Sequence, residues 1–526
     1  MQESTELILL CALNSTYQHT AFGLRYLKAN LEDLSDQCQI YEFTISQNSK
    51  DIVEKILSLK PRILGFGVYI WNTHEVLEII KLIKKIDPSI SIVLGGPEIS
   101  YETEKQEHIY YSDYIIKGEA DLSFYKLCKE LLAKTIASQS VFSSEKSTLA
   151  QIISPEIPAI TEIKLPYELY TTEDISNRVI YVEASRGCPY KCEYCLSSLD
   201  KSVRNFDLNT FLAAMESLMN QGAREYKFVD RTFNLSPSIS QSILNFFLQH
   251  IDKNIFLHFE MVPDRLPDEL KDLIQKFPSG VLQFEVGIQT LDETVSKNVS
   301  RRQNVSKIKE NFEFLKTKTF VHTHADLIVG LPGESLNSFQ KGFNDLVFMG
   351  PDEIQVGILK RLRGTPIVRH DLSYSMVYSD KAPYEIIQNK DLSFFEVQKM
   401  TRFSKHWDMI ANSGNWKHFI NKLQDFNDDK DIFTKFSYLS DFLLSRHANL
   451  YGISLLNLAE SLWIYMTENL HWETIDSLKI LIQDYCFNKY RDLPAFLKKQ
   501  DPIRSLSLQV YDELKQDNFN KSHFNS

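Results

Sequence analysis

The chain has 526 residues, of which 43% are hydrophobic, and this length is too great for a single hydrophobic core. We therefore expect about three domains. Lysine and arginine total 58 against 69 aspartates and glutamates, and the net charge of −11 disfavours a nucleic-acid substrate. The acidic start and the short apolar run over 7–13 do not fit a signal peptide. No apolar stretch approaches the roughly 18 residues of a membrane span, so we expect no membrane contact and a cytoplasmic location.

Residues 1–132 are predicted to form a doubly wound α/β domain. Short apolar runs alternate there with amphipathic stretches such as 73–86, which is typical of a parallel sheet covered by helices. Ligands of such sheets bind in the loops at the carboxyl ends of the strands. The predicted binding residues in these loops are Thr16, Tyr17, Gly67, Val68, Tyr69, Gly95, Gly96, Glu98, Gly118 and Glu119.

The rest of the chain is predicted to hold a linker, a second α/β series and a helical domain. Residues 133–177 are rich in Ser, Thr, Glu and Pro and lack sustained periodicity, as in a linker with short structured pieces. Over 178–377, six apolar runs separated by helical segments predict a partial (β/α)6 barrel with its active site at the strand carboxyl ends. Residues 378–526 are dense in aromatic residues and leucine and predict a mostly helical domain.

Three of the seven cysteines lie close together, directly after the first barrel strand. Their C-x3-C-x2-C spacing suits a [4Fe-4S] cluster in which the fourth iron has no protein ligand. An amine and a carboxylate of a substrate can chelate that iron, and an electron from the cluster can enter a sulfonium bond. A zinc site is the alternative, but it needs a fourth Cys or His near at hand. The predicted cluster ligands are Cys188, Cys192 and Cys195, and the predicted core thiols are Cys11, Cys38, Cys128 and Cys486.

The cysteine loop, with an aromatic residue before its third cysteine, resembles that of the radical S-adenosylmethionine (SAM) superfamily. The resemblance implies a cluster that cleaves SAM reductively to a 5′-deoxyadenosyl radical, with electrons from a donor of the flavodoxin or ferredoxin type. Segments at later strand ends, 228–234, 285–290 and 326–334, also match the family. The SAM-binding residues that the resemblance implies are Tyr194, Asp230, Glu285, Gln289, Arg301, Arg302 and Gly330.

A doubly wound domain before such a barrel resembles the cobalamin-binding class of this superfamily. Gly95-Gly96 matches the glycine pair against which the cobalamin nucleotide tail packs, and Gly118-Glu119 matches a Gly-Glu turn of the relatives. The chain lacks the D-x-H-x-x-G stretch that supplies an axial histidine in cobalamin mutases. His19 is the nearest candidate, and we expect cobalamin to bind base-off without it. A vestigial domain that binds no corrinoid is the alternative.

The leading hypothesis is an enzyme that methylates an unactivated carbon of a small-molecule or peptide substrate, with methylcobalamin as the methyl donor. A radical SAM cyclisation or rearrangement without methyl transfer is the rival reaction. A methylthiotransferase needs three further cysteines for a second cluster, and Cys38 and Cys128 are expected at a helix end and inside a helix. A non-catalytic cobalamin or redox sensor would not need the cysteine loop. The segment 359–366 and the helical tail resemble a subgroup with an uncharacterised C-terminal domain.

Overall fold

The computed structural model describes residues 8–137, 149–425, 431–447, 449, 452–487, 491–499 and 503–524. The fold divides into two compact units, each described here by itself. The first unit comprises Met1–Gly287, Ser296–His322 and Leu359–Ile386, and the second comprises Ile288–Val295, Thr323–Ile358 and Ile387–Ser526.

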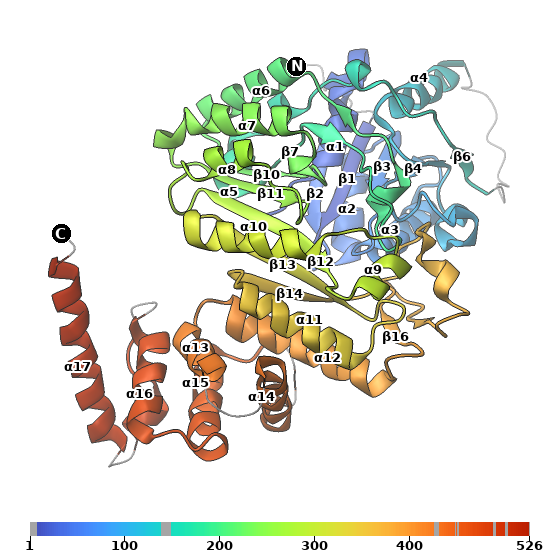
Figure 1. The fold of residues 1–526 in the computed structure, drawn as a ribbon. Coiled ribbons are helices and arrows are strands. Elements are labelled where there is room, and N and C mark those ends of the chain that lie inside the picture. Colours follow the sequence, from blue (N-terminus) through green and yellow to red (C-terminus); the bar gives the residue numbers. More distant parts are fainter. Residues whose placement is uncertain are drawn as a thin grey trace. The chain divides into compact units, whose positions relative to one another are not determined.

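The first unit begins with a six-stranded parallel sheet in the order β2-β1-β3-β4-β5-β6 (Figure 1). The doubly wound α/β domain is therefore confirmed. β6 lies in the segment expected as a linker and pairs with β5, while residues 138–148 of that segment lie outside the described residues. The strands are β1 (Ile8–Asn14), β2 (Cys38–Thr44), β3 (Ile63–Gly67), β4 (Ser91–Gly95), β5 (Tyr114–Ile116) and β6 (Gln151–Ile153).

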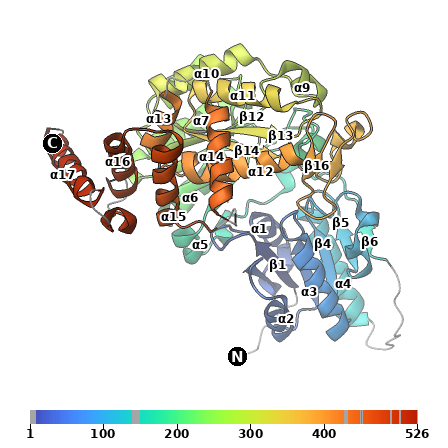
Figure 2. The same ribbon diagram turned by 90° about the horizontal axis from the view of Figure 1, so that it is seen from below.

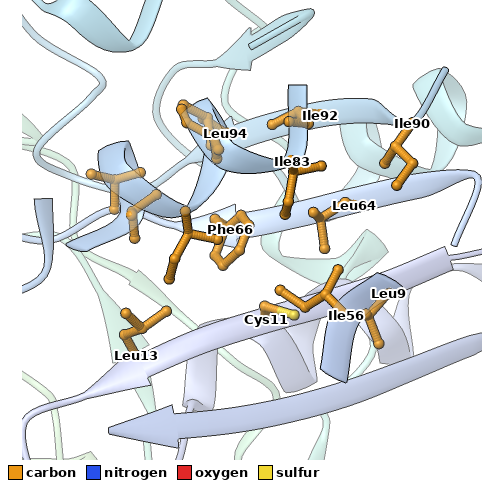
Figure 3. Close-up of a cluster of buried hydrophobic side chains, with 14 of the residues drawn as sticks. Leu9, Cys11, Leu13, Ile56, Leu64, Phe66, Ile83, Ile90, Ile92 and Leu94 are labelled. Carbon is orange, nitrogen blue, oxygen red and sulfur yellow. The ribbon is translucent and has the colours of Figure 1, made fainter. Parts of the chain in front are cut away.

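Helices cover both faces of this sheet because each strand carries apolar side chains on both sides. On β1, Leu9, Cys11 and Leu13 lie in one core cluster with side chains of α2 (Ser49–Ser58) and α3 (Thr73–Ile86), as Figure 3 shows. The alternate β1 residues lie in a second cluster, together with Cys38, Cys128 and side chains of α1 (Phe22–Ala29) and α4 (Asp121–Ala137).

The four cysteines outside the cluster loop are buried, as expected of core thiols: Cys11, Cys38, Cys128 and Cys486. Cys11 lies on one face of the N-terminal sheet, whereas Cys38 and Cys128 lie on the other. Because the sheet separates them, these three thiols are not arranged to bind a second cluster. This arrangement disfavours the methylthiotransferase hypothesis.

The first four barrel strands pair in parallel in the order β7, β10, β11, β12. On β11, Leu257 and Phe259 are buried among other apolar side chains, and Phe259 contacts Phe228 of β10 with ring centroids 4.4 Å apart. His258 and Glu260 alternate with them and so lie on the other face. The elements are β7 (Ile180–Val182), α6 (Leu208–Asn220), β10 (Glu225–Phe228), α7 (Pro237–Leu248), β11 (Phe256–Met261), α8 (Asp268–Ile274), β12 (Leu282–Gln289) and α10 (Val305–Lys318).

Buried ion pairs join the N-terminal domain to the segment that leads into the barrel. Arg25 of α1 contacts Glu42 at 2.6 Å and Asp174 at 2.8 Å, and Arg178 contacts the same two carboxylates at 2.5 and 2.8 Å. Two cations and two anions alternate, so each charge has two partners of opposite sign. A buried charge left without a partner is costly, and this network therefore opposes separation of the two parts.

The second unit contains the parallel pair β13 (His322–Val329) and β14 (Glu353–Ile358), with α11 (Leu336–Met349) between them in sequence. All six strands expected for the barrel are therefore present. The C-terminal segment is mostly helical, as predicted from its content of aromatic residues and leucine. Figure 2 shows these helices in orange to red. None of the helices in the described residues has the length and apolarity needed to cross a membrane. The C-terminal helices are α12 (Phe394–Trp407), α13 (Lys417–Asp425), α14 (Ile432–Arg446), α15 (Leu455–Ile464), α16 (Thr474–Ile482) and α17 (Ile503–Phe524).

Candidate functional site

The three clustered cysteines lie in a loop that two short strands close at its base. β8 (Ser185–Arg186) pairs antiparallel with β9 (Arg204–Asn205), so that Arg186 lies opposite Arg204. The loop between them carries Cys188 and Cys192, both buried, and Cys195, which is half-buried. The fold thus places all three thiols in one closed segment.

Gly187 makes the turn into this loop possible. Its φ is +90°, and a Cβ at this position would lie 2.0 Å from the carbonyl oxygen of Ser202. Only glycine avoids that overlap. The backbone N–H of the next residue, Cys188, donates to the carbonyl oxygen of Asp200 at 3.0 Å. The start of the loop is therefore held against its end.

The spacing of the thiols suits a cluster better than a single ion. Across the described residues, no group of three His, Cys, Asp or Glu side chains is close enough to hold one metal ion. A zinc ion gathers its ligands around one centre, whereas a four-iron cluster binds each thiolate at a different iron. Three thiols in one short closed loop are compatible with the ligands of a [4Fe-4S] cluster.

Glu193, between the second and third cysteines, anchors the middle of the loop. Its buried carboxylate accepts a hydrogen bond from Ser300 Oγ and contacts His370 Nε2 at 2.9 Å and Arg369 at 2.5 Å. Its backbone N–H donates to the carbonyl oxygen of Val299 at 3.1 Å. Sequence reasoning missed Glu193, because its partners come from distant segments and leave no local signal.

Of the two arginines predicted to bind the SAM carboxylate, only Arg301 reaches the cysteine loop. Its Nη1 donates to Tyr194 Oη at 3.2 Å and lies 3.5 Å from Cys192 Sγ, and Nη2 donates to the carbonyl oxygen of Gly287. Burial raises the pKa of Tyr194. Arg302 is exposed. The structure thus brings Tyr194 and Arg301 together beside one cluster ligand.

Asp230 lies at the carboxyl end of β10, where its carboxylate holds the chain just before the cysteine loop. It accepts hydrogen bonds from the Ala184 backbone N–H at 3.0 Å and from Ser185 Oγ at 2.6 Å. Burial raises its pKa to about 7, although these hydrogen bonds act in the opposite direction. Each carboxylate oxygen thus accepts one hydrogen bond within the protein and keeps a further lone pair. The role of Asp230 in holding the SAM amino group stays a prediction.

Glu285 of β12 belongs to a group of charged side chains on the inner barrel face. It is in register with Glu260 of β11, and its carboxylate lies 3.1 Å from His258 Nε2. Arg231 contacts Glu260 at 2.9 Å. Burial raises the pKa of Glu260, and the neighbouring Glu285 charge adds to this rise. Carboxylates in such a setting can accept hydrogen bonds from the hydroxyl or amino groups of a ligand.

Gln289 and Gly330, the remaining predicted SAM residues, lie in the second unit. Both have positive φ, +69° and +93°. The Gly330 carbonyl oxygen accepts a hydrogen bond from Asn389 Nδ2 at 3.1 Å. A left-handed backbone is unusual for glutamine and marks the end of β12 as a constrained position.

A cavity of about 200 Å³ lies against one face of the N-terminal sheet. This sheet face is bare at Gly65 and Gly67 of β3 and Gly95 of β4, which all point to the side of α1 and α4. The cavity lies at the carboxyl ends of β3, β4 and β5, and Leu10 from the middle of β1 also lines it. Doubly wound sheets bind ligands at the carboxyl ends of their strands. Six predicted residues line it, namely Gly67, Tyr69, Gly95, Gly96, Gly118 and Glu119.

The other four residues predicted for this site lie elsewhere. Val68 is buried in the core. Thr16 and Tyr17 are exposed, and the Tyr17 hydroxyl donates to Glu173 at 2.5 Å. Glu98 is buried and contacts Arg363 Nε and the Tyr384 hydroxyl, both at 2.7 Å, so it joins the domain to the segment after the barrel. These four do not line the cavity.

His19, the candidate cobalt ligand, is also outside the cavity lining. Its Nδ1 lies 2.6 Å from the Tyr181 hydroxyl, and its backbone forms a parallel bridge with Val179. Burial lowers its pKa. The imidazole is therefore engaged at the edge of the barrel sheet.

Several lining residues were not predicted, including Gly23, Gly65, Phe124 and Arg186. The sequence Gly65-Phe66-Gly67 could have predicted Gly65 as a lining residue, because glycines at positions i and i+2 of a strand place no side chain on the same face of the sheet. Nothing local marks Arg186 as part of this cavity, because it follows the first barrel strand.

Comparison with protein families assigns most of the chain to three models. Residues 8–127 match the B12 binding domain, and residues 182–346 match the radical SAM superfamily. The chain carries a radical SAM domain behind a B12-binding domain. Residues 372–525 match a protein family of unknown function, DUF4080.

Individual relatives are distant. The chain is 22% identical to the cobalamin-dependent radical SAM methyltransferase TokK of Streptomyces tokunonensis over 335 residues, which are 57% of this chain and 47% of TokK. It spans about half the length of the first curated relatives that it matches. Among solved structures, the radical SAM methyltransferase TsrM of Kitasatospora setae is similar at a TM-score of 0.58 and 16% identity, covering 71% of this chain and 77% of TsrM.

The cobalamin-dependent SAM radical enzyme OxsB has the same TM-score, 0.58, at 14% identity. That similarity covers 98% of this chain and 81% of OxsB. At such low identity these structures support the fold, and the fold agrees with the α/β architecture and the helical C-terminus described above.

Proposed function

We propose that this chain is a cobalamin-dependent radical SAM methyltransferase that acts on an unactivated carbon of a small-molecule or peptide substrate. The observation that carries the proposal is that Arg186 lines the bare-faced cavity of the N-terminal domain and stands two residues before Cys188. When bound, the cluster supplies the electron that cleaves SAM to the 5′-deoxyadenosyl radical, and cobalamin supplies the methyl group. A pocket and a cysteine loop this close suit a reaction that needs both cofactors.

The residues that would hold the cluster are Cys188, Cys192 and Cys195, in a loop shaped by Gly187 and Glu193. For SAM, Arg301 and Tyr194 stand beside the Cys192 ligand, and an arginine is suited to a carboxylate. Glu285 and Glu260 on the inner barrel face are suited to accept hydrogen bonds from hydroxyl or amino groups. Asp230 orients the strand end before the loop, and its remaining lone pairs would accept hydrogen bonds from the SAM amino group.

The cobalamin tail would lie on the bare sheet face formed by Gly65, Gly67 and Gly95. A Cβ at Gly65 would lie 2.7 Å from Leu10 Cδ2, and one at Gly67 would lie 3.0 Å from Tyr69 Cε2, whereas at Gly95 the nearest atom is the Ile116 carbonyl oxygen at 3.6 Å. Gly95 is therefore the position where a flat group could approach the backbone most closely. Because His19 is engaged with Tyr181, no imidazole from that position would lie below cobalt. Cobalamin bound here would therefore lack a His19 ligand, and we retain base-off binding as a prediction.

The test is anaerobic reconstitution with iron, sulfide, cobalamin, SAM and a reductant such as reduced flavodoxin or ferredoxin. Formation of both 5′-deoxyadenosine and S-adenosylhomocysteine supports a methyltransferase. Formation of 5′-deoxyadenosine alone would favour a cyclisation or rearrangement, and formation of neither by protein that binds both cofactors would favour a sensor. A low-potential cluster requires a reducing compartment, so we retain the cytoplasm as the proposed location.

A further inference from the structure

Glu119, at the turn before α4, contacts both ends of the cysteine loop. Its Oε2 lies 2.9 Å from Arg186 Nη1, and its Oε1 accepts a hydrogen bond from Arg204 Nη2. Arg186 and Arg204 are the residues that face each other in the β8-β9 pair at the base of the loop. One carboxylate of the N-terminal domain thus bridges the two strands that close the cluster-binding segment.

The Glu119 carboxylate offsets the repulsion between Arg186 and Arg204 at the base of the loop. Like charges directly opposite each other on antiparallel strands repel, and both arginines are largely buried, with 13% and 17% of their side chains exposed. Arg186 also contacts Glu183 and Asp121 at 2.9 Å, and Arg204 contacts Asp200 at 3.1 Å. Within the part of the chain that the structure describes, Glu119 is the carboxylate that forms ion pairs with both arginines.

From this base the contacts continue to the first cluster ligand. Asp200, which pairs with Arg204, is also the residue whose carbonyl oxygen accepts the Cys188 N–H at 3.0 Å. Arg186 is separated from Cys188 only by Gly187, whose turn leaves no room for a Cβ. A displacement of either arginine therefore changes the position of the Cys188 backbone.

The same glutamate lines the N-terminal cavity, next to Gly118 and Asp121. Gly118 has a φ of +72°, and no atom lies within 4 Å of the position of a Cβ there, so the turn has open space on its cavity side. A group bound in the cavity would restrict this turn and, with it, the Glu119 carboxylate. Arg186 and its partner Asp121 also line the cavity, but Glu119 is the lining carboxylate that contacts both Arg186 and Arg204.

We propose that Glu119 is a positioning residue that couples the cavity to the cysteine loop, so that cobalamin binding and cluster binding strengthen each other. The inference rests on the proposed function, because it takes the cavity as the cobalamin site and the loop as the cluster site. By thermodynamic linkage, the factor by which the cluster raises cobalamin affinity equals the factor by which cobalamin raises cluster affinity. An ion pair that only holds two domains together would contribute stability without this reciprocity.

The experiment measures the dissociation constant of hydroxocobalamin anaerobically, for cluster-free and for cluster-reconstituted full-length protein. We expect the reconstituted wild type to bind about fivefold more tightly or better, the lower limit of ordinary allosteric coupling. In Glu119→Gln, which keeps the shape of the side chain and removes its charge, the ratio of the two constants should fall towards one, although Arg186 and Asp121 still line the cavity. Glu119→Asp keeps the charge but is shorter, and should restore part of the ratio.

Glu102→Gln is the matched control. Glu102 also joins the N-terminal domain to a later segment, through Arg361 at 3.1 Å, but it does not line the cavity. Its variant should keep the wild-type ratio. The reciprocal measurement, iron retained during chelator challenge with and without hydroxocobalamin, should show the same coupling in the wild type and lose it in Glu119→Gln.

A wild-type ratio of one would overturn the inference while leaving the proposed function intact, since both cofactors would still bind. If neither form binds hydroxocobalamin, the proposed function itself fails and the inference fails with it. Even if Glu119→Gln is too unstable to purify, the ratio of the two wild-type dissociation constants still tests whether cobalamin binding and cluster binding are coupled. Equal loss of the ratio in Glu102→Gln would show a general effect of domain contacts and would also overturn the role of Glu119.

Discussion

Gly96 lies so close to Val68 that a Cβ at Gly96 would stand 2.6 Å from the Val68 carbonyl oxygen. Its φ of +103° adds a second reason for glycine at this position. Gly96 therefore shapes the turn after β4 itself, whatever the cavity contains. Gly95 differs, because the nearest atom to a Cβ there is the Ile116 carbonyl oxygen at 3.6 Å, an ordinary contact.

Because Gly96 and Gly95 have different surroundings, substitutions at the two positions test the stability of the N-terminal domain and its cobalamin binding separately. Gly96→Val should lower the thermal unfolding midpoint of corrinoid-free protein, because the Val68 backbone must move. Gly95→Val should leave that midpoint near the wild-type value and abolish cobalamin binding, because its side chain fills the cavity. Thermal unfolding and equilibrium dialysis with hydroxocobalamin test the pair. Wild-type cobalamin affinity in Gly95→Val would remove the cavity from consideration as the tail site.

Substitution of a cysteine in the loop should have a different effect from substitution of a cysteine in the core. Cys188→Ala, Cys192→Ala and Cys195→Ala should each lose the cluster absorbance and SAM cleavage, because each removes one of three protein ligands. Cys128→Ala, in the core of the N-terminal domain, should keep about four irons per reconstituted chain. Iron and sulfide analysis after anaerobic reconstitution provides the measurement. A loop variant with full iron and activity would contradict the assignment.

The contact between His19 and Tyr181 predicts the state of cobalt. With the imidazole engaged outside the cavity and the cofactor base-off as predicted, Co(II)-cobalamin bound to the wild type should show no nitrogen superhyperfine splitting in its electron paramagnetic resonance spectrum. His19→Ala should give the same spectrum. Nitrogen splitting that is present in the wild type and absent from His19→Ala would instead identify His19 as an axial ligand.

The raised pKa of Glu334 predicts how the free energy of unfolding changes with pH. Burial raises its pKa to about 8, and the nearby Asp292 charge contributes, although a hydrogen bond from Thr290 Oγ1 at 2.6 Å opposes the rise. The unfolded chain releases this proton near pH 4.5, the ordinary pKa of a glutamate, while the folded chain retains it up to about pH 8. The stabilisation is therefore complete below about pH 4.5 and is lost as the pH rises to about 8.

Urea unfolding of cluster-free protein across that pH range measures the effect. The free energy of unfolding of the wild type should fall with rising pH, and Glu334→Gln should fall less steeply, because glutamine does not titrate. Glu396→Gln is a suitable control, since Glu396 is the helix-capping partner of Ser393 and its pKa is lowered, not raised. Identical slopes for the wild type and Glu334→Gln would mean that Glu334 ionises normally in the folded state.

Much of the architecture could be predicted from short segments. Short apolar runs and helical patterns predicted both α/β series, the aromatic-rich composition predicted the helical tail, and the spacing of Cys188, Cys192 and Cys195 predicted a cluster loop. The Gly95-Gly96 pair and the Gly118-Glu119 turn line the cavity, and their role in binding stays a prediction. These features are local, because apolar runs, ligand spacing and glycine turns depend on residues a few positions apart.

By itself, then, the sequence determined the class of each domain and the type of chemistry at the cysteine loop. Only the tertiary structure decided what each strand-end side chain contacts. Glu98 and Glu119 look alike in sequence, yet Glu98 bonds Arg363, 265 positions away, whereas Glu119 lines the cavity and bonds Arg186, 67 positions away. The physical reason is that a buried carboxylate is satisfied by whichever cation the folded chain brings within hydrogen-bond distance, and that partner leaves no trace in the local pattern.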